Sequence, residues 1–338
     1  MEVAPADQII SKHINAGFPD EDDVNGDDVA YQLIPFFRAF KDGRVQRFFG
    51  TDFVPPSDTP LGAGVSSKDV MIEPKTGVSA RLFKPGSAVV DPTSTHERRR
   101  RLPLLIYIHG GAFCVGSPFC PTYHNLLTSI VAQANVVAVS LDYRLAPENP
   151  LPAAYEDAWS VLKWVASHAN GQGPDPWIND YADLNQTYIA GESAGANIAH
   201  NASVRAGSEG LPDGVKLVGG CLVHPDFASK ERVLTDVWAF ANPTSVGLDD
   251  PHVNPSKDAV LSKIPWERVL VMLTERDFLR AGGLFYYETM KELSGWGGCV
   301  EMMETEEEEH AFHLFNPTCD KAVDLVKRIA SFLNTNRG

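Results

Sequence analysis

The stretch "YIAGESAGANIAH", from Tyr188 to His200, contains the pattern that decides the fold. Its apolar start ends the run "QTYIA", which predicts a strand, and the residues from Ala194 onward predict a helix. The turn between them, GESAG at residues 191–195, matches GxSxG in the strand–turn–helix context that this motif requires. In such a turn the serine hydroxyl projects from the sheet, and the helix N-terminus directs backbone N–H groups toward it. Ser193 is therefore the candidate nucleophile.

Apolar runs alternate with amphipathic segments on both sides of this motif. An alternating hairpin over residues 67–85 comes first. Strands are then predicted at residues 102–109, 135–143, 186–190, 215–224, 267–275 and 299–304, and helices at residues 153–169, 194–206, 283–295 and 320–334. Strands separated by helices indicate βαβ crossovers. The predicted fold is a doubly wound, mostly parallel α/β sheet with antiparallel strands near the N-terminus.

The composition indicates one large globular domain without a nucleic acid partner. The chain has 338 residues, 43% of them hydrophobic, which suits a single α/β unit with an accessory segment. Its net charge of −15 disfavours binding to nucleic acid or to an anionic membrane. The basic run at residues 98–101 is interpreted as a solvated loop.

The cysteines and the N-terminal residues favour a cytoplasmic location. The five cysteines show no CxxC pair and no repeated spacing, so neither a disulfide framework nor a zinc site is expected. The N-terminus shows no secretory signal, and no apolar run is long enough to span a bilayer.

A second glycine-containing loop supplies candidate hydrogen-bond donors for a negatively charged intermediate. The strand at residues 102–109 ends in "HGGAF", which resembles the HGGG-type loop whose N–H groups stabilise an oxyanion. Ala112 replaces the last glycine of that pattern but keeps its N–H. His109 is expected to anchor the loop and not to act as the base, because it precedes the serine in the chain.

The order of nucleophile, acid and histidine selects the remaining candidates. Asp277 falls just past the end of a predicted strand, at the edge where open α/β sheets place functional groups. The competing carboxylates are Glu275, at the strand end, and Asp249 and Asp250, in the loop "GLDDPHVNP".

His310 is the candidate base, because it follows the next predicted strand. His313 is its rival but is expected to be a core or helix-start residue. The glutamates before His310 are expected to form a solvated loop face that raises the pKa of His310 modestly. A zinc site built from Glu309, His310 and His313 is the alternative, although no HExxH or Cys spacing supplies a further ligand.

With these motifs in place, the chain resembles the plant carboxylesterases of the hormone-sensitive-lipase-like branch of the α/β hydrolases. The resemblance extends over nearly the whole length. Its segments are "FKDGRVQRF", "VPPS", "DYRLAPENPLPAAYEDAW", "GESAGANIAHN", "LDDPHVNP", "FYYETMKELSGW" and "HAFHLFNP".

This resemblance implies a single α/β-hydrolase domain over residues 1–338, in which residues 1–60 contribute to a helical cap. It implies Ser193 as nucleophile, His310 as base and Asp277 as the residue that orients it. The oxyanion hole it implies is formed by backbone N–H groups, at Gly110, Gly111, Ala112 and Ala194. It implies a small-molecule ester as substrate, no cofactor, no metal, and a monomer or homodimer.

Relatives within this branch keep two other functions open. Gibberellin receptors share the fold but lack the catalytic histidine, whereas this chain keeps His310. The 2-hydroxyisoflavanone dehydratases and alkaloid-forming cyclases or lyases use such a site for elimination or rearrangement. The segment at residues 226–248, expected to border the pocket, is shorter than is usual in this branch and has Asp226 where an aromatic residue is common.

Overall fold

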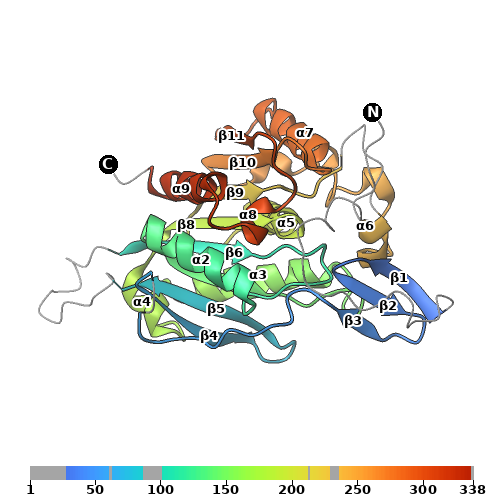
Figure 1. Ribbon diagram of the computed structural model, residues 1–338. Coiled ribbons are helices and arrows are strands. Elements are labelled where there is room, and N and C mark those ends of the chain that lie inside the picture. The colour runs from blue at the N-terminus through green and yellow to red at the C-terminus, as the bar shows by residue number, and fades with distance from the viewer. Residues whose placement is uncertain (1–27, 61–62, 87–100, 212–213, 229–235, 336–338) are drawn as a thin grey trace, which may run out of the picture.

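The computed structural model describes residues 28–60, 63–86, 101–211, 214–228 and 236–335. Its centre is a single eight-stranded sheet with the order β11-β10-β9-β8-β6-β7-β5-β4 (Figure 1). The bounds are β4 Val65–Glu73, β5 Val78–Pro85, β6 Leu102–Ile108, β7 Val137–Asp142, β8 Ala182–Glu192, β9 Leu217–Val223, β10 Arg268–Thr274 and β11 Cys299–Thr305. The strands from β6 to β11 pair in parallel, while β4 and β5 form the antiparallel start. The fold class predicted from the sequence is confirmed.

Helices cover both faces of this sheet. Their bounds are α2 Pro121–Ala134, α3 Ala153–Ala166, α4 Pro176–Tyr181, α5 Ala194–Glu209, α6 Asp236–Ala241, α7 Arg280–Lys291, α8 Phe312–Phe315 and α9 Asp320–Asn334. Short 3-10 helices lie at Gly247–Asp249, Pro255–Lys257 and Leu261–Lys263. No helix in the described ranges has both the length and the apolar character needed to cross a membrane.

Strand β6 shows how the two layers of the core arise. Leu104, Ile106 and Ile108 face the apolar cluster that includes α3 and α5. Leu105 and Tyr107 face the cluster that includes α2 and α9. Successive side chains of a strand point to opposite faces, so a continuous apolar run fits only a strand that is buried on both sides. The buried parallel strands β6, β8 and β10 therefore have their carboxyl ends at the same edge of the sheet, where the candidate site lies.

Several parts of the fold were not predicted, and two of them lie near the candidate site. Helix α2 follows the HGGAF loop, and the N-terminal strands β1 Val29–Leu33, β2 Phe37–Phe40 and β3 Val45–Arg47 form a separate antiparallel sheet. In Figure 1 this small sheet lies beside α6, and Tyr31 of β1 stacks on Phe240 of α6 with ring centroids 4.5 Å apart. Its strands have only three to five residues, too few for alternation to indicate them. Residues 1–27 and 229–235, parts of the expected cap and pocket-bordering segments, lie outside the described ranges.

Candidate active site

Ser193 occupies a sharp turn between β8 and α5. Its backbone has φ 53° and ψ −120°, a conformation that is strained for a residue with a side chain. The flanking glycines are required by close contacts. A Cβ on Gly191 would lie 2.2 Å from the carbonyl oxygen of Gly195, and a Cβ on Gly195 would lie 2.1 Å from that of Ile108. The GxSxG pattern therefore allows strand and helix to approach closely enough to expose the serine hydroxyl at the sheet edge.

The structure brings Ser193, His310 and Asp277 into one hydrogen-bonded line. The Nε2 atom of His310 lies 3.0 Å from Ser193 Oγ, and its Nδ1 atom lies 2.8 Å from Asp277 Oδ2. With the proton on Nδ1, the imidazole donates to Asp277 and accepts from the serine hydroxyl. The backbone N–H of Leu279 donates to the other oxygen of Asp277 at 2.7 Å, which orients the buried carboxylate.

The competing carboxylates have other partners. Glu275 accepts the N–H of Glu307, and Asp249 pairs with Lys257 on the surface. Asp250 is bound within a separate polar cluster, where it accepts the hydroxyl of Ser245 and both the N–H and the Nδ1 of His252. The carboxylate that contacts His310 through a hydrogen bond is that of Asp277.

The charged groups that raise the pKa of His310 lie in other parts of the chain, and not in the run of glutamates before it. Burial by itself lowers the pKa of His310, but the charge and hydrogen bond of Asp277, and the charges of Glu192 and Asp226, outweigh burial and raise it to about 9. The glutamates that directly precede His310 are not among these causes. Glutamates 307 and 308 instead face the Lys321 ammonium.

His313 is buried in α8, in agreement with the expected core position. The set of Glu309, His310 and His313 does not form a metal-ligating group in the described ranges. The group that does lie close enough there consists of His224, Asp277 and His310, whose ligand atoms are within 4.8 Å of one another. Both ring nitrogens of His310 already face Asp277 and Ser193, so a metal ion at this point would disrupt that line of hydrogen bonds.

The HGGAF loop lies beside Ser193, and three of the four expected oxyanion donors, two of them in this loop, remain available. The N–H of Gly110 donates to the Tyr123 hydroxyl at 2.9 Å, so it is engaged elsewhere. The N–H groups of Gly111, Ala112 and Ala194 have no backbone acceptor within the described ranges. Gly111 has φ +106°, and a Cβ there would lie 2.1 Å from the carbonyl oxygen of Val115. Glycine is thus the residue that this tight loop accepts.

His109 anchors the loop. Its Nδ1 lies 2.7 Å from the carbonyl oxygen of Gly110, and its ring stacks on Tyr143 with centroids 4.3 Å apart. The Tyr143 hydroxyl in turn donates to the carbonyl oxygens of His109 and Gly110. Burial lowers the pKa of His109 to about 4, so the ring is neutral and serves as a structural donor.

Asp142 and Arg144 of the "DYRLAPE" stretch bind other parts of the fold. Arg144 binds the buried carboxylate of Asp157 with two of its guanidinium nitrogens, and its own N–H donates to the same side chain. Asp142 accepts the hydroxyl of Ser79, and burial raises its pKa to about 6. In the described part of the chain, neither Asp142 nor Arg144 lines the cavity at Ser193.

A cavity of about 280 Å³ opens above Ser193. Its walls are mainly aromatic and aliphatic: Tyr31, Leu33, Phe36, Phe49, Val237, Phe278, Leu279, Leu314 and Phe315. The carboxylates of Glu192, Asp226 and Asp236 also line it, and no Lys or Arg does so in the described ranges. Such a site suits an apolar molecule that carries few polar groups.

Comparisons with known proteins agree with this geometry. A family model described as the alpha/beta hydrolase fold matches residues 105–314, which include Ser193, Asp277 and His310. The probable carboxylesterase 2 of Arabidopsis thaliana is 42% identical over 320 residues, covering 90% of this chain and 96% of the relative. This chain belongs to the α/β-hydrolase family.

Other members of this family carry different functional names. The 2-hydroxyisoflavanone dehydratase of Glycyrrhiza echinata is also 42% identical to this α/β hydrolase, covering 89% of this chain and 95% of the relative. Among solved structures, esterase LipW from Mycobacterium marinum aligns with a TM-score of 0.65 and 25% identity, over 81% of this chain and 82% of that one.

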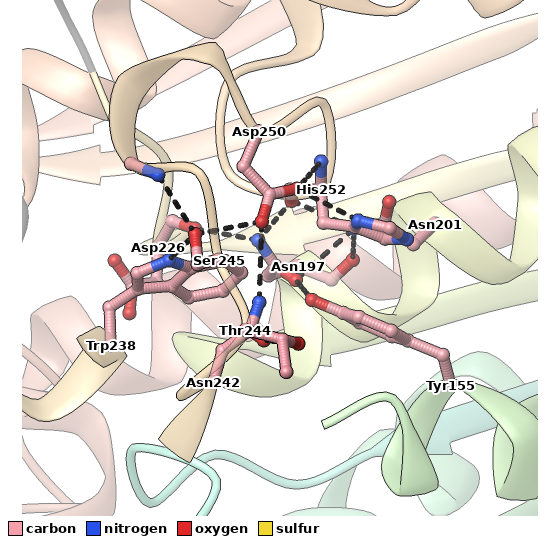
Figure 2. Close-up of polar contacts among 11 residues, drawn as sticks. Tyr155, Asn197, Asn201, Asp226, Trp238, Asn242, Thr244, Ser245, Asp250 and His252 are labelled. Atoms are coloured by element: carbon pink, nitrogen blue, oxygen red, sulfur yellow. Dashed lines mark hydrogen bonds and ion pairs between the residues drawn. The ribbon is translucent and has the colours of Figure 1, made fainter. Parts of the chain in front are cut away.

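A polar cluster around Asn197 connects α5 to neighbouring segments (Figure 2). Asn197 lies one turn after Ser193 in α5 and is fully buried. Its amide nitrogen donates to the carbonyl oxygens of Asp226 and His252, at 3.0 and 2.8 Å, and its oxygen accepts the hydroxyl of Tyr155 at 2.8 Å. One side chain thus connects helix α5 of this α/β hydrolase to α3 and to two loop segments.

Three side chains that surround Ser193, Asp277 and His310 were not identified from the sequence. Glu192 lies inside the GxSxG motif, at a position that the motif leaves open. Tyr123 comes from the unpredicted helix α2, and no sequence signal marked it. His224 directly follows β9 and accepts the N–H of Ala311 through Nδ1 at 3.2 Å, which fixes the loop next to His310. The run "LVHPDF" contains this histidine but does not show what it contacts.

Proposed function

We propose that this protein is a carboxylesterase that cleaves carboxylic esters of small molecules through an acyl-enzyme. The observation that carries the proposal is the line of hydrogen bonds from Ser193 through His310 to Asp277, at the floor of a largely apolar cavity. The carboxylesterase relatives and the esterase structure support the same activity.

The reaction follows from the positions of the three side chains. His310 Nε2 takes the proton of Ser193 Oγ while this oxygen attacks the ester carbonyl carbon. The N–H groups of Gly111, Ala112 and Ala194 stabilise the negative charge that develops on the carbonyl oxygen. Protonated His310 then gives its proton to the departing alcohol. Water repeats the attack on the acyl-enzyme, and the acid product leaves.

Asp277 keeps the imidazole in the productive tautomer. Its carboxylate accepts the Nδ1 proton, so the lone pair of Nε2 faces the serine, and it stabilises the imidazolium that forms during each half-reaction. No cofactor or metal is part of this scheme.

The expected substrates are neutral esters with apolar groups. The cavity walls offer aromatic and aliphatic surface for such groups, and in the described ranges three carboxylates and no Lys or Arg line the cavity. We infer that residues 28–60 act as part of the cap, with Tyr31, Leu33 and Phe36 in contact with substrate. On this proposal the chain is a single domain whose 226–248 segment borders the pocket through Asp226, Asp236 and Val237.

The proposal is tested with Ser193→Ala and a short p-nitrophenyl ester. We expect hydrolysis by this variant to fall to the background rate while circular dichroism and thermal unfolding stay unchanged. Labelling of the wild-type protein by a fluorophosphonate should occur and should be lost in the variant, because an unactivated serine does not react. Undiminished hydrolysis by the variant contradicts the proposal, and a wild-type protein that binds a gibberellin without labelling favours the receptor function.

A second candidate function is a dehydratase, or another lyase or cyclase of plant specialised metabolism. It is favoured by the 42% identity to the 2-hydroxyisoflavanone dehydratase. In this reaction His310 would remove a proton from carbon without an acyl-enzyme. Incubation with hydroxyisoflavanones or acetylated alkaloids, followed by mass spectrometry, separates the two functions by loss of water or of acetate.

A cytoplasmic location is part of the proposal. All five cysteines lie in the described ranges and are free thiols, which suits a reducing compartment. Fractionation of cells that express the tagged full chain tests this location.

A further inference from the structure

A second carboxylate lies next to the nucleophile. The side chain of Glu192 is 2% exposed, lines the cavity at Ser193 and directs Oε1 toward Nε2 of His310 at 3.5 Å. The same ring nitrogen lies 3.0 Å from Ser193 Oγ. An imidazolium formed at His310 would therefore have a carboxylate on each side, Asp277 at Nδ1 and Glu192 at Nε2.

The other oxygen of Glu192 is connected to the HGGAF loop. The fully buried hydroxyl of Tyr123 donates to Glu192 Oε2 at 2.8 Å and accepts the N–H of Gly110 at 2.9 Å. The contact between Glu192 and Gly110 is close, because a Cβ on Gly110 would lie 2.1 Å from Glu192 Oε2. Glycine at this position, the tyrosine and the glutamate thus form one packed unit.

The position of Gly110 determines where the following N–H groups point. Gly111 and Ala112 are the next two residues, and both have positive φ values, 106° and 53°. A hydrogen bond that holds Gly110 therefore restrains this loop at its start. Tyr123 lies on α2, in the cluster formed by α2 and α9, so it provides a rigid support.

We propose that Glu192 and Tyr123 are positioning residues for ester cleavage: Glu192 stabilises the His310 imidazolium, and Tyr123 holds Gly110 so that the next two N–H groups face the oxyanion. The proposal rests on the proposed function. It adds no bond-forming step, since Glu192 stays a carboxylate and Tyr123 keeps its proton.

The direction of the pH effect follows from these contacts. Burial raises the pKa of Glu192, whereas the charge of His310 and the hydrogen bond from Tyr123 oppose that rise. The charge of Glu192 is among the causes that raise the pKa of His310. The titratable groups that face His310 are Asp277, Glu192, Asp226, His224 and His313, and those that face Glu192 are His310, Asp277, Tyr107, Tyr123 and Tyr143.

The first test compares Glu192→Gln with wild type. The glutamine keeps the volume and an oxygen that can accept from Tyr123, but it removes the charge. We expect the apparent pKa of kcat/KM for p-nitrophenyl acetate to fall by about one unit, since an opposite charge within 4–6 Å shifts a pKa by this order. We expect kcat on the high-pH plateau, where His310 is neutral, to fall about tenfold while KM changes less than about twofold, because the charge acts on the transition state. Glu209→Gln, at the exposed end of α5, makes the same chemical change and should leave the profile unchanged.

The second test uses Tyr123→Phe, which removes both hydrogen bonds of the tyrosine. We expect kcat to fall about tenfold or more at every pH. This loss approaches the effect of removing one oxyanion-hole donor. A pH profile and kcat equal to wild type in both variants, with only the melting temperature lowered, would overturn the proposal. If Glu192→Gln does not fold, the kcat of Tyr123→Phe alone decides.

The rate of fluorophosphonate labelling of Ser193 against pH is measured in parallel. This readout reports the activated serine without an ester substrate. Labelling that follows the predicted pH shift while no ester is hydrolysed supports the positioning role and contradicts the carboxylesterase function. Labelling that is insensitive to both variants overturns the positioning role.

Discussion

The Oδ2 atom of Asp277 lies 2.8 Å from the Nδ1 atom of His310, although 33 residues separate the two in the chain. Strand β11 runs between them, parallel to β10, so both residues emerge at the same edge of the sheet. A second hydrogen bond, from the N–H of Leu279, keeps the carboxylate in this orientation. The contact fixes both the tautomer and the angle of the imidazole.

Asp277→Asn should therefore preserve the fold and remove most of the activity. The amide can present its NH₂ group to Nδ1, which favours the tautomer with the proton on Nε2 and leaves Ser193 without a base. We expect kcat for p-nitrophenyl acetate to fall by about 10⁴, as in other serine hydrolases with this change. A change in kcat of less than about tenfold would contradict the role of Asp277. Thermal unfolding serves as the control for the fold.

The pH dependence of ester hydrolysis should be set by His310. The neutral imidazole is the base, and its pKa is raised to about 9, so kcat/KM should increase with pH and level off above that value. Initial rates between pH 6 and 10, corrected for spontaneous hydrolysis, give the apparent pKa. A profile that is already flat between pH 7 and 9 would show that another group controls the reaction.

The raised pKa of His310 should also make stability depend on pH. Stability should decrease with rising pH, whereas activity should increase. The folded pKa of His310, about 9, is higher than the ordinary value of 6.5, so folding favours the protonated form. The resulting stabilisation is fully present below about pH 6.5 and is lost as the pH rises to about 9. We expect the free energy of unfolding of the wild type, relative to His310→Gln, to decrease over this interval. Urea denaturation at a series of pH values measures it.

Asn197 should make a large contribution to stability. Asn197→Leu keeps a similar volume but removes the hydrogen bonds of Asn197 to the Asp226 carbonyl oxygen and the Tyr155 hydroxyl, while the His252 carbonyl oxygen keeps the hydrogen bond from Asn201. We expect the free energy of unfolding to fall by about 2–4 kcal/mol, since each buried group left unpaired costs about 1–3 kcal/mol. Asn201→Ala, at a less buried position that shares the His252 acceptor, is the matched control and should cost about 1 kcal/mol. Equal losses in the two variants would contradict the central position of Asn197 (Figure 2).

The charge of the substrate should affect binding strongly. The cavity is lined by the carboxylates of Glu192, Asp226 and Asp236. We expect kcat/KM for a p-nitrophenyl hemisuccinate to be at least about tenfold lower than for the neutral butyrate, which corresponds to about 1.4 kcal/mol. High salt should narrow only the part of this gap that comes from the exposed Asp236, because the buried Glu192 and Asp226 are screened much less. Faster hydrolysis of the anionic ester would show that a cationic group dominates the pocket.

Much of the fold was predictable because it depends on local patterns. The apolar runs at residues 102–109 and 267–275 indicated buried parallel strands, and β6 and β10 occupy them. Helix α2 was not predicted, and α7 ends at Lys291, four residues before the expected end at Gly295. The short strands of the N-terminal sheet carry too few residues to show a period, and their position depends on contacts such as that of Tyr31 with Phe240.

The sequence by itself determined the positions of Ser193, Asp277 and His310, because a strained turn and a fixed chain order leave local signatures. Only the tertiary structure decided that Tyr123 bridges Gly110 to Glu192 and that the Gly110 N–H is engaged. It likewise decided that the pKa of His310 is raised by Asp277, Glu192 and Asp226, and not by the adjacent glutamates. The physical reason is that such contacts join residues from different strands and helices. Their distances depend on strand order and helix packing, which no single stretch of sequence encodes.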